Sequence, residues 1–228
     1  AKVGRDADPY FLQDTYVVGD PFLGQALASA STSAANANLK PEFTTEFEFG
    51  VNLEFFKKRF GFDLTYFDKK STNQIAPIDV PSSTGYESAY ANFGSISNKG
   101  WEAEVHGTPV STRNFNWEIR GTFTKITSTV ESLMEGLLRL SRGGVFTEIG
   151  PYFEPGLPYG YIRGSVSARD NKGNLLIDPS TGMVLNAKEP TMIGNPNPDF
   201  KAGLINTITY KGFFLNAVFD MTKGGDLY

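Results

Sequence analysis

A strict alternation of apolar and polar side chains over residues 43–56 constrains the fold of this chain more than any other sequence feature. The first set is Phe43, Thr45, Phe47, Phe49, Val51, Leu53 and Phe55, and the second is Thr44, Glu46, Glu48, Gly50, Asn52 and Glu54. Successive side chains of a β-strand point to opposite faces of a sheet. A period of two sustained over this length therefore predicts one long strand with an apolar and a polar face.

The same alternation recurs in pairs of strands that are joined by short turns. The predicted hairpins are residues 43–66 with a turn at 57–59, residues 101–123 with a turn at 108–114, and residues 200–219 with a turn at 211–212. In the third hairpin Ile205 and Asn206 each interrupt one face, which a strand tolerates. Aromatic residues make up 14% of the chain and there are 24 glycines, a composition that favours strands and turns over helices.

Short and long connections alternate along the chain. The short links are the three hairpin turns, and the long links, rich in Gly, Pro, Ser, Asn and Asp, are about 5–41, 69–92 and 128–198. Short turns at one end and long loops at the other are typical of outer-membrane barrels, and aromatic residues beside the short turns fit an interfacial girdle. We predict an all-β fold, an antiparallel up-and-down transmembrane β-barrel, present as a partial arc of about six or seven strands with long extracellular loops.

The two faces of such an arc have different expected surroundings. The apolar face would meet outer-membrane lipid, and the polar face would line the lumen. The lumen-facing candidates are Glu46, Glu48, Asp63, Glu102, Glu104, Glu118 and Arg120. The alternative is a soluble β-sandwich, a binding or adhesion module, whose core would contain the same apolar face. Strands of this length favour the barrel.

Composition and charge argue against several other functions. A net charge of −4 without a Lys/Arg cluster gives no reason to expect nucleic acid as a partner. His106 is the single histidine and there is no cysteine, so we expect no catalytic, cofactor or metal site. The carboxylate pairs Glu46/Glu48 and Glu102/Glu104 have a spacing compatible with a glycosidase, but ordinary lumen lining explains them better.

Three further segments give local expectations. Residues 170–174 and 178–182 begin like calcium loops but lack the remaining carboxylates, so we expect turns of a small hairpin between Ala168 and Leu185. The apolar spacing over residues 130–138 predicts a short amphipathic helix. The chain opens with residues 1–4, Ala-Lys-Val-Gly, without an apolar leader, and we expect it to be part of a longer protein.

Several motifs together resemble the C-terminal barrel half of the SusC/RagA family of TonB-dependent transporters. The most specific is residues 92–102, which read N-F-G-S-I-S-N-K-G-W-E and are similar to the family's N-x-G-x-I-x-N-K-G-x-E. The others are N-L-K-P-E at 38–42 with Thr45 and Glu46, F-K-K-R-F at 56–60, D-L-T-Y-F-D-K-K at 63–70, F-N-W at 115–117, G-L-P-Y-G at 156–160, I-G-N-P-N-P-D-F at 193–200 and Y-K-G-F at 210–213. They follow the family's order along nearly the whole chain.

The resemblance implies a location, a function and partners. Residues 1–228 would be a partial barrel without the signal peptide or plug domain, and large transporters need about 22 strands, so the remaining barrel strands would be partners. The parent would reside in the outer membrane and import a glycan or peptide nutrient, with energy from the TonB complex and a SusD-like surface lipoprotein as lid. In the loop at 128–198, the candidates for contact with ligand or lid are Tyr152, Phe153, Tyr159 and Tyr161. The resemblance also favours an extended segment over the helix at 130–138.

Overall fold

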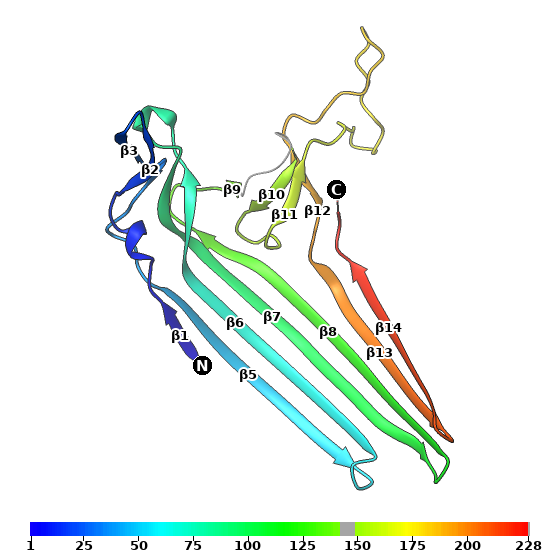
Figure 1. Cartoon of the computed structure of the whole chain (residues 1–228). Helices are drawn as coiled ribbons and strands as arrows, with labels where there is room; N and C mark the ends of the chain where they lie inside the picture. Colours follow the sequence, from blue (N-terminus) through cyan, green and yellow to red (C-terminus); the bar gives the residue numbers. More distant parts are fainter. Residues whose placement is uncertain (142–148, 228) are drawn as a thin grey trace.

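One large antiparallel sheet dominates the computed structural model, which describes residues 1–141 and 149–227 (Figure 1). Its strands are β1 (Lys2–Arg5), β5 (Glu42–Phe55), β6 (Phe60–Asp79), β7 (Ser88–Ser111), β8 (Phe115–Leu133), β13 (Pro198–Tyr210) and β14 (Phe213–Gly224). They pair in the order β1-β5-β6-β7-β8-β13-β14, and the short β4 (Ser33–Ala34) pairs with β7. The sheet is an open up-and-down arc, which confirms the predicted fold class.

Smaller elements gather at one end of the sheet (Figure 1). A four-stranded sheet has the order β12-β11-β10-β9, and β2 and β3 form a separate hairpin. The bounds are β2 (Tyr16–Phe22), β3 (Gln25–Ala30), β9 (Leu140–Ser141), β10 (Gly150–Phe153), β11 (Tyr161–Gly164) and β12 (Thr191–Gly194), with 3-10 turns η1 (Pro9–Phe11) and η2 (Ser82–Thr84). Among the described residues, no helix combines the length and apolar character needed to cross a bilayer.

The three short turns of the large sheet lie together at its other end, the lower right of Figure 1, as the loop lengths predicted. Two predicted loop boundaries were wrong. β6 extends to Asp79 and β7 begins at Ser88, so the expected loop 69–92 shrinks to 80–87. β7 also continues to Ser111, which leaves a turn of 112–114. The backbone ladder holds these polar segments in the sheet although their side chains lack the apolar alternation.

The helix predicted at 130–138 was also wrong, because β8 continues to Leu133. Ile96 pairs with Val130 while Ser95 pairs with Ser132, so one extra residue bulges from β8 between them. The bulge brings Val130 and Leu133 to the same face of the strand. The spacing of three between Val130 and Leu133, which is also typical of a helix, therefore results from a bulge in a strand.

The hydrophobic core lies where β9 and β10 pack against the upper parts of β7 and β8. Its buried members are Phe93, Ile96, Val130, Leu140 and Phe153, with Ala76, Ile78, Leu133, Leu137 and Tyr159 partly buried around them. The ring centroids of Phe93 and Phe153 are 5.9 Å apart. This core anchors the four-stranded sheet to the large one.

Residues 92–102, the most specific motif in the sequence, hold the upper sheet together. The Asn92 side chain accepts a hydrogen bond from the Lys40 N–H and donates to the Lys40 and Asn73 carbonyls, at 2.8 Å in each case. Asn98 accepts a 2.6 Å hydrogen bond from the Ser128 hydroxyl. At Gly94, a Cβ atom would meet the backbone carbonyl of Ser132, so glycine permits close approach of β7 and β8.

Gly94→Ala is expected to destabilise the fold by about 1–3 kcal/mol, because the added methyl group overpacks a backbone that has little freedom to move. Gly121→Ala is the matched control, since its Cβ would lie 4.0 Å from the nearest atom, the Gly203 carbonyl oxygen. The urea midpoint of the folded full-length protein measures both effects. Equal midpoints for the two variants would contradict the close-approach explanation.

Candidate functional site

All seven predicted lumen-facing residues project from the same face of the large sheet, which we call the polar face. The strand registers place them together: Asp63 is opposite Glu104, and His106 is opposite Arg120. Glu46, Glu48, Asp63, Glu102, Glu104, Glu118 and Arg120 come from β5, β6, β7 and β8. Ile96 and Val130 share this face, so the four-stranded sheet packs on the same side.

The centre of the polar face is a network of polar side chains. Asn52 donates a 2.9 Å hydrogen bond to Asp63, and Arg120 lies 3.6 Å from Glu104. His106 Nδ1 is 3.5 Å from the same Glu104 oxygen, which is too long for a strong bond, and this nitrogen has no hydrogen-bond partner among the described residues. Shallow hollows between these groups suit contact with hydrated, polar solutes. The described ranges contain no cluster of three or more His, Cys, Asp or Glu that would hold a metal.

The opposite, apolar face is exposed. Its members include Phe47, Phe49, Val51, Leu53, Phe60, Phe62, Leu64, Tyr66, Trp101, Val105, Trp117, Phe123, Leu204, Phe213, Phe219 and Met221. Phe49 is 60% exposed, Val105 53% and Phe213 79%. A β-sandwich would cover this face with a second sheet, so the sandwich alternative was wrong. Asn206, which interrupts the pattern, accepts a 3.4 Å hydrogen bond from the Trp117 ring N–H.

The apolar face ends at a consistent height on neighbouring strands. Starting from the short turns, the first charged residues on this face are Asp68 of β6, Lys125 of β8 and Lys223 of β14, eight to ten residues from the strand starts. A transmembrane β-strand of a tilted barrel needs about 9–11 residues. The height of the apolar band therefore matches a bilayer core.

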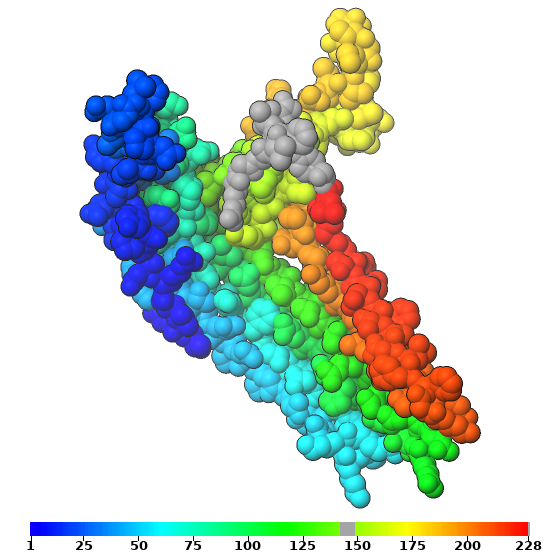
Figure 2. All heavy atoms as spheres, viewed as in Figure 1, coloured from blue at the N-terminus to red at the C-terminus, as the bar shows by residue number. Residues whose placement is uncertain are grey.

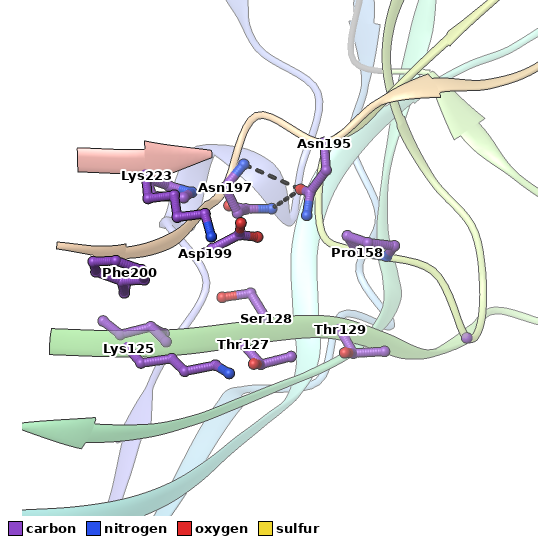
Figure 3. Close-up of a pocket in the computed structure, with 13 residues that line it drawn as sticks. Lys125, Thr127, Ser128, Thr129, Pro158, Asn195, Asn197, Asp199, Phe200 and Lys223 are labelled. Carbon is purple, nitrogen blue, oxygen red and sulfur yellow. Dashed lines mark hydrogen bonds between the residues drawn. The ribbon is translucent and has the colours of Figure 1, made fainter. Parts of the chain in front are cut away.

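Figure 3 shows a break in the sheet between β8 and β13. It begins at Lys125 and Lys223, which mark the upper boundary of the apolar band. The β8–β13 ladder ends where Thr124 pairs with Lys201. Further along β8, the segment 156–159 forms backbone hydrogen bonds with β8 in place of β13. Tyr159 donates its N–H to the Ser128 carbonyl at 3.0 Å. A cavity of about 560 Å³ separates these two pairings.

The sequence around Asn195 explains this break. Pro196 and Pro198 lack a backbone N–H, so they weaken pairing with β8 at this point. Asn197 instead donates to the Tyr159 carbonyl at 2.9 Å. It also donates to the Asn195 side chain at 2.9 Å (Figure 3). The cavity was not predicted from the sequence, although Pro196 and Pro198, the second of which begins β13, were the signal for it.

The predicted loop aromatics occupy different environments. Phe153 is 3% exposed and Tyr161 1%, so both rings are buried inside the chain and offer no surface to a sugar or lid. Tyr159 is partly buried, with its ring centroid 4.6 Å from that of Phe153. Tyr152 is half-buried, and the Arg163 guanidinium lies 5.5 Å from its ring centroid. Of the four, Phe153 and Tyr161 therefore serve the core.

Tyr161 is held by a hydrogen bond of 2.7 Å from its hydroxyl to Glu154. Burial and this carboxylate raise the pKa of Tyr161 to about 12, above its usual value of 10.0. A raised pKa favours the protonated form in the folded state, so this contribution to stability is complete below about pH 10 and is lost between about pH 10 and 12.

Tyr161→Phe is expected to cost about 1.5 kcal/mol at neutral pH, because a hydrogen bond to a charged group is lost. The variant should also flatten the alkaline decline in stability. Thermal unfolding of the full-length protein between pH 8 and 12 measures both effects. An unchanged pH profile in the variant would show that other groups cause the decline.

Residues 168–185 form the small hairpin expected from the sequence, and this segment projects from the molecule in Figure 2. The Asp170 carboxylate accepts hydrogen bonds from the backbone N–H groups of Lys172 and Asn174. Asp178 accepts one from the Ser180 N–H in the same way. Hydrogen bonds from the Asn174 amide and the Ser180 hydroxyl, followed by these backbone bonds, lower the pKa of the Asp170 and Asp178 carboxyls. Both segments are turns.

A long antiparallel meander whose apolar face is exposed over the height of a bilayer core is typical of the wall of a transmembrane β-barrel. Residues 6–226 match the family described as TonB-dependent receptor-like, β-barrel. The chain belongs to this family.

Individual relatives agree with this assignment. TonB-dependent receptor P26 of Formosa agariphila is 28% identical, and the match covers 100% of this chain and 25% of the relative. TonB-dependent receptor SusC of Bacteroides thetaiotaomicron is 23% identical, and the match covers 90% of this chain and 22% of the relative. A chain from the structure of the RagAB peptide transporter superposes with a TM-score of 0.74 at 20% identity, over 96% of this chain and 25% of that one. The chain thus spans about a quarter of the length of these relatives.

Proposed function

We propose that this chain forms part of the barrel wall of an outer-membrane, TonB-dependent importer. The apolar face meets lipid, and the polar face lines the lumen with the network around Glu104. The height of the apolar band carries the proposal: charge is absent from the described apolar face over a bilayer-sized span and begins at Asp68, Lys125 and Lys223.

The proposed cargo is a polar nutrient, a glycan or a peptide. The carboxylates and hydroxyls of the polar face suit hydrated solutes, and one structural neighbour is a peptide transporter. The proposed partners are the remaining barrel strands, the TonB complex, and a SusD-like surface lipoprotein that acts as a lid. Import of labelled peptides and oligosaccharides by cells with and without the full-length receptor distinguishes the two cargo classes.

Spin labels on neighbouring residues test the assignment of the faces. Glu104 and Val105 are adjacent on β7 but project from opposite faces, and this chain has no cysteine that would compete for the label. In the reconstituted full-length receptor, a label at Val105→Cys should respond to oxygen, which concentrates in lipid. A label at Glu104→Cys should respond to a water-soluble nickel reagent. The reverse pattern would contradict the proposal.

A further inference from the structure

The strands β6, β7, β8 and β14 each place one lysine on the apolar face, at the upper boundary of its apolar band. Lys99 is 3.0 Å from Asp68, and Lys70 is 3.6 Å from Glu131, so these two are paired with carboxylates. The other two are Lys125 and Lys223. Neither has a carboxylate within ion-pair distance in residues 1–141 and 149–227.

Both unpaired lysines line the break between β8 and β13 (Figure 3). Phe200 shares the lining, and the Lys223 ammonium lies 5.9 Å from the centre of its ring. The remaining lining is rich in hydrogen-bonding groups, namely Thr127, Ser128, Thr129, Asn195, Asn197 and Asp199. Asp199 is the one carboxylate among the lining residues, so the two lysines leave the lining with a net positive charge.

The chemistry of this region is layered along the wall. Phe123 and Phe200 are packed with ring centroids 5.5 Å apart at the top of the apolar band. Lys125 follows Phe123 on the same face, and the threonines of β8 follow Lys125. The order from the bilayer outward is apolar, cationic and then hydroxyl-bearing. An amphiphile with acyl chains, a phosphate and a sugar has the complementary order.

We propose that this break binds the phosphorylated sugar headgroup of an outer-leaflet glycolipid. The ammonium groups of Lys125 and Lys223 bind the phosphate, and the hydroxyl and amide groups of the cavity bind the sugar. The acyl chains lie against Phe123 and Phe200. This inference rests on the proposed function, because the apolar face must meet lipid for such a headgroup to reach the break.

Binding of lipid A to the purified full-length receptor tests the site, with native mass spectrometry as the readout. Lys125→Gln/Lys223→Gln should weaken binding roughly tenfold or more, since each lysine near an anionic headgroup contributes to the attraction. Lys201→Gln is the matched control. It removes the same charge opposite Thr124, one residue from Lys125, but on the polar face. The control should bind lipid A like the unchanged receptor.

Two further ligands separate the chemical origins of binding. Dephosphorylated lipid A should bind at least tenfold more weakly than the phosphorylated form, and millimolar inorganic phosphate should not displace lipid A. The inference would be overturned if both forms of lipid A bound equally well, or if free phosphate displaced lipid A. It would also be overturned if the double variant bound lipid A like the unchanged receptor, or if Lys201→Gln weakened binding as much as the double variant does. The spin labels at residues 104 and 105 report separately on the barrel, so failure of the lipid site is distinguishable from failure of the proposed function.

Discussion

Leu64→Arg in the full-length receptor is expected to prevent stable assembly in the outer membrane. Leu64 lies midway between Phe60 at the short-turn end and Asp68 at the top of the apolar band. An arginine facing lipid near the bilayer midplane costs about 2–4 kcal/mol. This is a large part of the roughly 5–15 kcal/mol that stabilises a typical folded protein. The amount of receptor in the outer-membrane fraction, and its heat-dependent mobility in gels, measure the effect.

Thr65→Arg is the control for this experiment. Thr65 is the next residue of β6 and pairs with Glu102 and Gly50 on the polar face. An arginine there enters a hydrated surface that carries carboxylates, so assembly should remain close to normal. If Thr65→Arg lowered the amount of receptor in the outer membrane more than Leu64→Arg does, the assignment of the two faces would be reversed.

Residues 1–228 expressed alone are expected to aggregate or to require denaturant. The far edge of β14 has no partner strand in the described chain. The far edge of β5 is covered only over residues 42–46, by β1 and Ala1. Each unpaired backbone group costs several kcal/mol in lipid, and long exposed edges promote aggregation in water. Light scattering after size-exclusion chromatography measures the state of the isolated chain.

The decisive control is the full-length receptor, in which we expect these edges to pair with further barrel strands. It should be monodisperse in detergent. A monodisperse, detergent-free monomer of residues 1–228 that unfolds cooperatively would contradict both the open-edge argument and the proposed barrel function, because only a self-contained soluble β-domain behaves in that way.

The sequence by itself determined the two-faced strands and the end of the sheet at which the short turns lie. Both are local properties. The alternation over residues 43–56 can be recognised without knowing the neighbouring strands, because neighbouring side chains of any strand point to opposite faces. The turn at 211–212 is equally local, with Lys211 and Gly212 both at positive φ. Residues 92–102 could be recognised as a motif, but their hydrogen bonds to Lys40 and Ser128 could not.

Only the tertiary structure decided where the alternation of side chains between the two faces is interrupted, and which residues outside the long strands are buried. The spacing of Val130 and Leu133 looks helical in the sequence, but it results from a bulge in β8. The bulge could not be predicted, because the register of β8 depends on its partner β7. Burial of Phe153 and Tyr161 depended on how the four-stranded sheet packs on β7 and β8. The lysines at 125 and 223 are far apart in sequence and share one cavity only because β13 and β14 return beside β8. Contacts between distant segments are set by the packing of the whole sheet, and no local pattern encodes them.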